Sequence, residues 1–377
     1  MKKEYLLFNK NENMKEIKPV HYHEYLQLDK ILNAQDLESS KYGKPAHEET
    51  LFIIIHQVYE LWFKQIIHEL DSLIDAFNTD NVDEKSIGVV VARLNRVIEI
   101  QKILIDQLKV LETMTPLDFL EFRNYLVPAS GFQSFQFRQV EVKLGLPQEK
   151  RLKYNKHAYH KSLTPSQEKE ILELEKQDSV FDLLEKWLER TPFLESKNFN
   201  FLEAYKNVTD SILESEKEAM DKSIVIGEQN KEVRDYMLKE TKACFDSITD
   251  KKMHDELVAK GERRLSHKAT AAALFINLYR DQPVLHLPYQ FMSALVDIDE
   301  LFTTWRYNHA LMVMRMIGKK VGTGGSAGHD YLRKTSVQHK IFTDLNNITT
   351  LLVPRSVLPE LPGDFVKELG FYFTAMK

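Results

Sequence analysis

His309 is the residue whose type and surroundings are best suited to holding a metal ion. Its segment carries apolar residues with the period of a helix, and the apolar positions of this stripe are Leu295, Ile298, Phe302, Trp305, Met312, Val313 and Met316. Trp305 lies four residues before His309, so the two rings share the buried face of the predicted helix. An imidazole there could ligate a metal ion or a haem iron, although a lone buried histidine more often forms a hydrogen bond within the core.

His56 is a second histidine that lies in an apolar segment. Phe52 lies one helical turn before it, within the apolar run 51–55. Residues 47–77 are apolar almost all round in their first half, so we expect a long helix that lies deep in the core. Like His309, His56 could form a hydrogen bond within the core or contribute to a functional site.

A di-iron site in a helical bundle is an alternative use of these residues. His56 and Glu60 are four residues apart, as are Lys64 and His68, and Glu69 adds a carboxylate nearby. Bundles of that kind carry a Glu-x-x-His motif on each of two helices. The chain does not supply this motif in paired form, so the sequence does not favour a di-iron site.

Arg123 lies in an otherwise apolar segment, whose other members are Phe119, Phe122, Tyr125, Leu126 and Ala129. A buried guanidinium group requires a partner, because an isolated buried charge is costly. The carboxylate of a bound amino acid is one such partner, since the guanidinium can donate two parallel hydrogen bonds to it. A salt bridge to an aspartate or glutamate of the chain is the commoner alternative.

Residues 322–328 form a glycine-rich loop after the helix of His309. The loop is unlike a phosphate-binding loop, because it follows a helix and no Gly-Lys-Ser/Thr sequence comes after it. A mobile flap over a pocket is the better interpretation, since glycines provide hinge freedom and Thr323 offers a hydroxyl group.

Long helices must position these residues. We expect helices over 22–34, 47–77 and 84–114, one that starts at Thr115-Pro116 and stops before Pro128, and one that ends at Gly145. Pro288 suits the first turn of the helix that carries His309, and Gly318 suits the position after its last turn. Residues 1–20 are polar and expected to be flexible. Residues 146–265 are rich in Lys and Glu, which predicts a more polar insertion of solvated surface helices. For residues 336–377 we expect one or two short helices.

The composition predicts a single all-α domain over residues 1–377, with that polar helical insertion. Only 13 Gly and 12 Pro occur in 377 residues, which favours long helices over a many-turned β fold. A net charge of −5 without a basic stripe argues against a nucleic-acid partner. No run approaches the about 18 apolar residues of a membrane span, and no signal peptide is recognisable. The single cysteine, Cys244, indicates a reducing, cytoplasmic location.

Three motifs of the chain resemble the tryptophan 2,3-dioxygenase family. They are WRYNHALMVMRMIG from Trp305 with the following GTGGSAG, HEETLFIIIHQVYELWFKQIIHELD from His47, and FRNYLVPASGFQSFQFR from Phe122. The resemblance implies an all-α, haem-dependent enzyme that inserts both atoms of O₂ across the indole C2–C3 bond of L-tryptophan. The product would be N-formyl-L-kynurenine, and the enzyme would be a homotetramer with one haem b per subunit.

The resemblance also implies roles for individual residues. His309 would be the axial ligand of the haem iron, with Trp305, Ser130 and Gly131 close to the haem. His56 would accept a hydrogen bond from the indole N–H, Arg123 would bind the substrate carboxylate, and Thr323 would bind its ammonium group. The other residues that it places around the substrate are Phe52, Ile53, Ile54, Ile55, Phe119, Leu126 and Ala129, together with Tyr22 and Tyr25 from a neighbouring subunit.

Overall fold

The computed structural model describes residues 18–152, 158–192, 194–196, 199–225, 231–323 and 329–370. In these ranges the chain is built of helices, apart from two antiparallel two-residue strands, β1 (Glu195–Ser196) and β2 (Phe199–Asn200). The all-α prediction is therefore confirmed. No described helix combines the length and apolar character that a membrane span requires.

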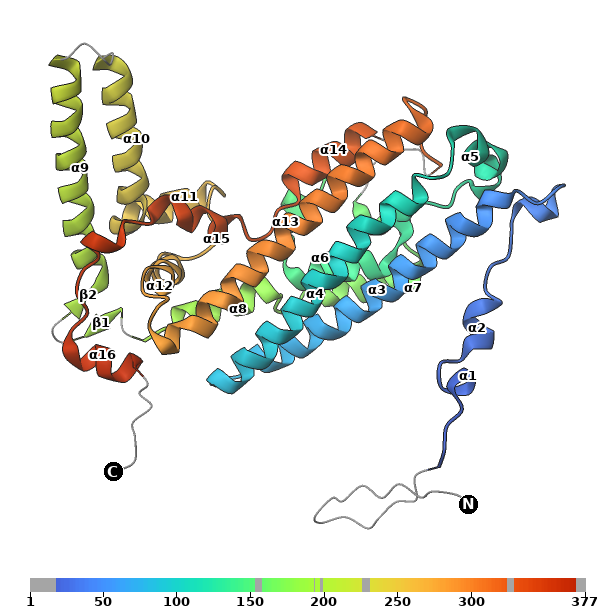
Figure 1. Ribbon diagram of the computed structural model, residues 1–377, viewed down its shortest axis with the longest axis horizontal. Helices are drawn as coiled ribbons and strands as arrows, with labels where there is room; N and C mark the ends of the chain where they lie inside the picture. Colours follow the sequence, from blue (N-terminus) through green and yellow to red (C-terminus); the bar gives the residue numbers. More distant parts are fainter. Residues whose placement is uncertain are drawn as a thin grey trace.

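Three long helices lie side by side and form the body of the molecule (Figure 1). They are α3 (His47–Phe77), α4 (Glu84–Leu111) and α13 (Pro283–Ile317), with α6 (Phe135–Leu144) against α3 and α14 (His329–Gln338) against α13. The fully buried side chains between them include Ile66, Leu70, Leu94, Leu295 and Ile298. The helices expected over 47–77 and 84–114 are thus confirmed, as is the buried apolar stripe of the His309 helix.

The remaining elements are shorter or lie outside this body. The α-helices are α1 (Tyr22–Tyr25), α2 (Leu28–Leu32), α5 (Pro116–Arg123), α7 (Pro165–Leu174), α8 (Val180–Glu189), α9 (Phe201–Val225), α10 (Lys231–Thr249), α11 (Lys251–Ala259), α12 (His267–Leu278), α15 (Thr343–Asn347) and α16 (Gly363–Leu369). Single 3-10 turns are η1 (Ser39–Lys41), η2 (Asn124–Leu126), η3 (Gly131–Gln133), η4 (Gln148–Lys150), η5 (Tyr159–Ser162), η6 (Ile348–Leu351) and η7 (Arg355–Val357).

The helix expected over 22–34 is wrong as a single element. Gln27 has a left-handed backbone with φ of 51°, and this conformation separates α1 from α2. The two short helices form an arm that extends away from the body beyond the start of α3 (Figure 1). On this arm Tyr22 and Tyr25 are 71% and 74% exposed, so the arm is not held by packing against its own chain. The expected flexibility of residues 1–20 concerns mainly 1–17, which lie outside the described residues.

Two expectations about the functional helices are also wrong in detail. The first half of α3 is not the deepest part of the core, because Ile54 is 42% exposed while Ile66 and Leu70 in the second half are fully buried. The helix of His309 begins at Pro283 and not near Pro288, which lies inside it. Pro283 occupies the first turn, where a missing N–H costs nothing, whereas Pro288 deletes one internal hydrogen bond. Gly318 ends the helix as expected, with φ of 58°.

Helix α8 differs from the solvated surface helices expected over 146–265. Its buried side chains are Val180, Phe181, Leu183, Leu184 and Leu188, and they pack towards α3, α6 and α12. The charged residues of α8 occupy its other face, so the segment looks polar in composition although half of the helix belongs to the core. The α9–α10 hairpin does project from the body (Figure 1), and it carries the exposed Cys244. The single domain with its insertion stays a prediction.

Helix α6 ends where the sequence predicted, at Gly145. This residue has φ of 101°, in the left-handed region that favours glycine. A Cβ at Gly145 would lie 2.5 Å from the Ser179 hydroxyl oxygen and 2.7 Å from the Phe181 Cβ atom. The close approach of α8 to the end of α6 therefore depends on the absence of a side chain at this position.

Replacing Gly145 with alanine is expected to lower the free energy of unfolding by more than about 2 kcal/mol, because backbone strain and a steric clash add together. Gly261→Ala is the matched control, since Gly261 also has a positive φ of 74° but no atom lies within 4 Å of the position that a Cβ would take there. The control isolates the backbone term of about 1–2 kcal/mol. Chemical denaturation of both variants measures the difference, and equal losses would contradict the packing argument.

Candidate functional site

His309 lies on α13 with its ring stacked on Trp305. The ring centroids are 5.5 Å apart and the ring planes differ by 16°. Burial, with a smaller contribution from His56, lowers the pKa of His309 to about 4. The imidazole is therefore neutral at pH 7, and within the described residues it has no hydrogen-bond partner. A neutral imidazole with a free lone pair is the form of histidine that ligates a metal.

His56 faces the same site from α3. Its Nδ1 lies 2.7 Å from the carbonyl oxygen of Phe52, and because a carbonyl only accepts, Nδ1 carries the proton. Burial also lowers the pKa of His56, although solvent can reach its ring. We call the surroundings that the rings of His56 and His309 share the recess. In this neutral tautomer Nε2 keeps its lone pair and can accept a hydrogen bond.

Aromatic rings form one wall of this recess. The ring of Phe52 lies 4.1 Å from that of His56, 5.7 Å from Phe119 and 5.5 Å from Phe122. Phe122 is fully buried and meets Phe119 edge to face at 5.3 Å. Sequence reasoning gave Phe122 no role of its own, yet it supports both of the rings that line the site.

Of residues 52–55, only Phe52 is seen to contact the other rings of this wall. Ile54 is exposed and Ile55 is buried in the core, so the side chains of consecutive residues meet different surroundings. A helix places residues on one face only when they are three or four positions apart, as Phe52 and His56 are. That Ile53, Ile54 and Ile55 line the substrate site together with Phe52 stays a prediction.

Arg123 and Thr323 link two segments at this end of the molecule. The Arg123 Nη2 donates to the carbonyl oxygen of Val321, and the Thr323 hydroxyl donates to the carbonyl oxygen of Ala129 at 2.7 Å. Among the described residues no carboxylate pairs with Arg123, so the alternative of an intrachain salt bridge is not realised there. The flap predicted from the glycine loop concerns mainly 324–328, which lie outside the described residues.

The segment around Arg123 is fixed from several sides. Tyr125 stacks on Tyr42 with ring centroids 4.8 Å apart. Ser130 accepts from the backbone N–H of Phe132 and forms a capping box with Gln133, which starts the 3-10 turn at Gly131. Leu126 is half-buried against the core, whereas Ala129 and Gly131 are exposed. Tyr22 and Tyr25 lie on the exposed arm, and the single chain does not bring them to His56 and His309.

Trp305 adds a buried polar group beside His309. Its Nε1–H does not meet strict hydrogen-bond geometry with any acceptor among the described residues. The Tyr59 hydroxyl lies close to it and donates its own proton to the Leu104 carbonyl oxygen at 2.7 Å, so the lone pairs of the Tyr59 oxygen are available to the indole N–H.

The chemistry of these residues is compatible with an iron-bearing cofactor. His309 offers a neutral imidazole with a free lone pair, Trp305 stacks on it, and His56 lies close by with the aromatic wall around Phe52. A di-iron site is not supported, because no group of three or more His, Cys, Asp and Glu suited to a metal occurs in the part of the chain that the structure describes.

The sequence did not lead us to predict a buried ionic cluster that the structure contains. It consists of Glu141 with Arg138, Arg151, Arg306 and His339, all of them less than 9% exposed. Charged residues in a helix are usually on its solvated face. Arg306 and His339 come from distant parts of the chain, whereas Arg138 and Arg151 lie three and ten residues from Glu141. Two signals were available in the sequence: the spacing of three between Arg138 and Glu141, and the position of Arg306 directly next to Trp305.

Comparison with known proteins shows the family of the chain. The family model described as tryptophan 2,3-dioxygenase matches residues 9–352. A tryptophan 2,3-dioxygenase of Bdellovibrio bacteriovorus is 50% identical over 355 residues, which cover 94% of this chain and 99% of the relative. Relatives of the same name from Alteromonas mediterranea and Dictyostelium discoideum are 48% and 46% identical over 95% of this chain, and the matches cover 99% and 90% of those proteins. The chain belongs to the tryptophan 2,3-dioxygenase family, and its activity is the oxidation of tryptophan to N-formylkynurenine.

Proposed function

We propose that the recess between α3, α5 and α13 is where L-tryptophan is oxidised, with one haem b bound per subunit. The observation that carries this proposal is the pair of neutral histidines, His309 and His56, which face one site from two helices. His309 would ligate the iron, and Trp305, Ser130 and Gly131 would lie along the porphyrin. When bound, the haem iron supplies the activation of O₂.

The two ends of the tryptophan zwitterion would be held by different segments. Arg123 uses one N–H for the Val321 carbonyl, and its other donors remain for the substrate carboxylate. The Thr323 hydroxyl can keep its bond to the Ala129 carbonyl and still accept from the ammonium group, because its oxygen has two lone pairs. Fixing both ends orients the indole ring, and orientation is a large part of the catalytic effect.

The indole ring would lie against the aromatic wall. Phe52 and Phe119 offer apolar faces, and Leu126 and Ala129 would contact the ring at its edge. The Nε2 of His56 would accept from the indole N–H, since Nδ1–H is engaged by Phe52. We expect His56 to hold the indole in place and not to remove its proton, because an indole N–H is a very weak acid compared with imidazolium.

Replacing His56 with alanine is therefore expected to reduce turnover by less than about 100-fold, below the range typical of a lost general base. His68→Ala is the control, because His68 is an exposed residue of the same helix. Formation of N-formylkynurenine, followed by its absorbance, measures both variants. Complete loss of turnover with intact tryptophan binding would instead identify His56 as an obligatory base.

The assembly is proposed to be a homotetramer located in the cytoplasm. In it, the exposed Tyr22 and Tyr25 would complete the substrate site of a neighbouring subunit, which would explain why this arm carries two uncovered aromatic rings. The single cysteine agrees with a reducing compartment.

A spectrum of the reduced protein under anaerobic conditions tests the proposed function. We expect a Soret band of histidine-ligated haem, followed by absorbance of N-formylkynurenine once air and tryptophan are admitted. Product formation by protein that carries no haem would contradict the proposal.

A further inference from the structure

The buried cluster around Glu141 joins three guanidinium groups to one carboxylate. Glu141 Oε2 accepts from the Nη1 atoms of Arg138 and Arg151, each at 2.8 Å, and Oε1 accepts from Arg306 Nη2 at 2.9 Å. Burial alone would raise the pKa of Glu141, but the three guanidinium groups hold it well below its usual range. The carboxylate is therefore ionised at neutral pH and acts as the common anion of the cluster.

The cluster connects elements that each carry part of the proposed site. Arg306 is on α13, three residues before His309, and Glu141 is on α6, which follows the segment of Ser130. His339 comes directly after α14, whose start adjoins the glycine loop. Arg306 Nη1 donates to the His339 carbonyl oxygen at 3.2 Å, and the His339 Nδ1 lies 3.5 Å from Glu141 Oε1.

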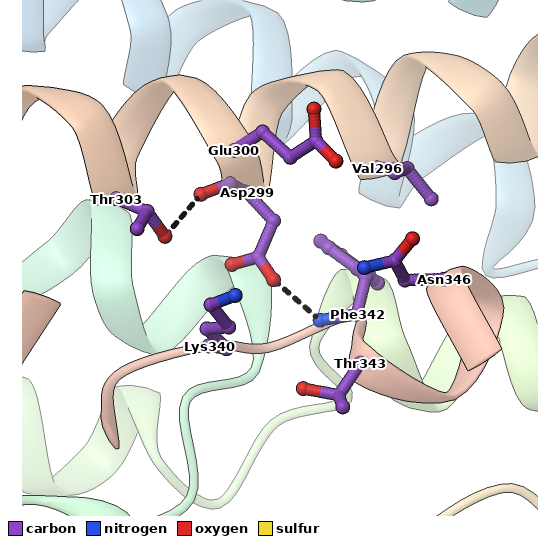
Figure 2. A pocket seen from close by; sticks show the side chains of 8 residues that line it. All are labelled: Val296, Asp299, Glu300, Thr303, Lys340, Phe342, Thr343 and Asn346. Carbon is purple, nitrogen blue, oxygen red and sulfur yellow. Dashed lines mark hydrogen bonds between the residues drawn. The ribbon is translucent and has the colours of Figure 1, made fainter. Parts of the chain in front are cut away.

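A second set of bonds holds the same chain segment to α13. Asp299 lies two helical turns before Arg306, and its carboxylate accepts from the backbone N–H groups of Ile341 and Phe342 at 3.0–3.2 Å. Figure 2 shows Asp299 pointing from α13 to Phe342, beside a cavity of about 10 Å³ with Lys340 at its edge. A cavity of this size has room for a single water molecule. Residues 339–342 are thus bonded to α13 at two positions of that helix, Asp299 and Arg306, which are seven residues apart.

A chain of ring contacts leads from this cluster to His309. Phe137 lies one turn before Glu141 on α6, and its ring centroid is 5.3 Å from that of Trp305. The guanidinium carbon of Arg306 lies 5.8 Å from the same Phe137 ring. Phe137 therefore contacts both neighbours, Trp305 and Arg306, and Trp305 stacks on His309.

We propose that Glu141 is a positioning residue, which fixes the rotation of α13 against α6 and thereby the direction in which the His309 ring points. Because a helix is stiff, a shift of Arg306 turns Trp305 and His309 with it. Without the carboxylate, three buried cations lose their common anion, and Arg306 has to move towards another acceptor or towards water. This inference rests on the proposed function, in which His309 ligates the haem iron.

Glu69 provides a matched control for a role that is merely structural. Its side chain is 4% exposed and lies 2.6 Å from Arg96 Nη1 and 4.0 Å from Arg93 Nε. Both of these arginines are on α4, so the ion pairs of Glu69 fasten α3 to α4 and involve neither α6 nor α13. Glu69→Gln thus removes a buried, arginine-paired carboxylate without touching the proposed link to His309.

The test compares Glu141→Gln and Glu69→Gln as haem-loaded proteins. Both substitutions are expected to lower the thermal midpoint of the protein. Only Glu141→Gln is expected to shift or broaden the Fe–His stretching band in the resonance Raman spectrum of the reduced protein. It is also expected to speed haem transfer to apomyoglobin by about 10- to 100-fold, the usual effect of losing a group that orients a metal ligand.

The remaining outcomes are also decisive. If Glu141→Gln does not fold, Arg306→Lys keeps the charge but loses the two-pronged bonding, and the same band shift is expected. A wild-type Fe–His band and haem transfer rate in the Glu141 or Arg306 variant would overturn the positioning role alone. If the unmodified protein shows no Fe–His band, or if His309→Ala retains it, the proposed function itself fails and this inference fails with it.

Discussion

Replacing His309 with alanine is expected to abolish tight haem binding and turnover. Loss of a group that merely orients a metal ligand costs about 10- to 100-fold in metal affinity, so loss of the ligand itself should cost more than about 100-fold. The neutral state of His309, with a pKa lowered to about 4, is what makes its lone pair available at neutral pH. Titration of the apoprotein with hemin, followed at the Soret band, measures the affinity.

Two further variants make this result specific. His309→Gly leaves space for free imidazole, and addition of imidazole is expected to restore part of the Soret band. His68→Ala, at an exposed position of α3, should bind haem as the unmodified protein does. Unchanged haem affinity in His309→Ala would remove the assignment of the iron ligand.

Arg123→Ala is expected to weaken tryptophan binding strongly while the haem spectrum stays intact. Removing one partner of a desolvated charge pair typically costs about 2–5 kcal/mol, which corresponds to a factor of about 30 or more in affinity. Among the described residues no carboxylate engages Arg123, so its charge is available to a ligand. Saturation of turnover with tryptophan measures the effect, and unchanged saturation would contradict the carboxylate contact.

A ligand without a carboxylate separates this contact from general damage to the site. 3-Methylindole has the ring of tryptophan but neither of its charged groups, so the unmodified protein and Arg123→Ala should bind it with the same affinity. Arg123→Lys keeps a positive charge but not the planar fork, and an intermediate loss is expected. Equal weakening for tryptophan and 3-methylindole would show that the substitution distorts the recess.

The sequence predicted those elements whose signals are local. The period of apolar residues gave α3 and α4, and the capping box of Thr115 with Asp118 marked the start of α5. Gln27 has no such signal, because a left-handed residue other than glycine is chosen by its surroundings and not by its own preference. Pro288 predicted a later start for α13 than the structure has, since the helix begins at Pro283.

The site was harder to predict because its parts are distant in sequence. Periodicity places His56 and His309 on two buried helices, but it cannot show that these helices bring the rings to one recess. The resemblance to a family supplied that step. Glu141 illustrates what neither source could supply, since its bond to Arg306 spans 165 positions and pairing of this kind leaves no periodic trace.

The bonds from Arg123 to Val321 and from Thr323 to Ala129 also bear on how strongly a ligand can bind. Both bonds form within the chain, so the conformational entropy of ordering these two segments is lost during folding and not during ligand binding. Each residue ordered during association would reduce the binding free energy by about 1–2 kcal/mol of lost conformational entropy. Because the segments of Arg123 and Thr323 are already ordered before a ligand binds, less free energy is spent on ordering them. More of the electrostatic attraction between these residues and the zwitterion then appears as net affinity.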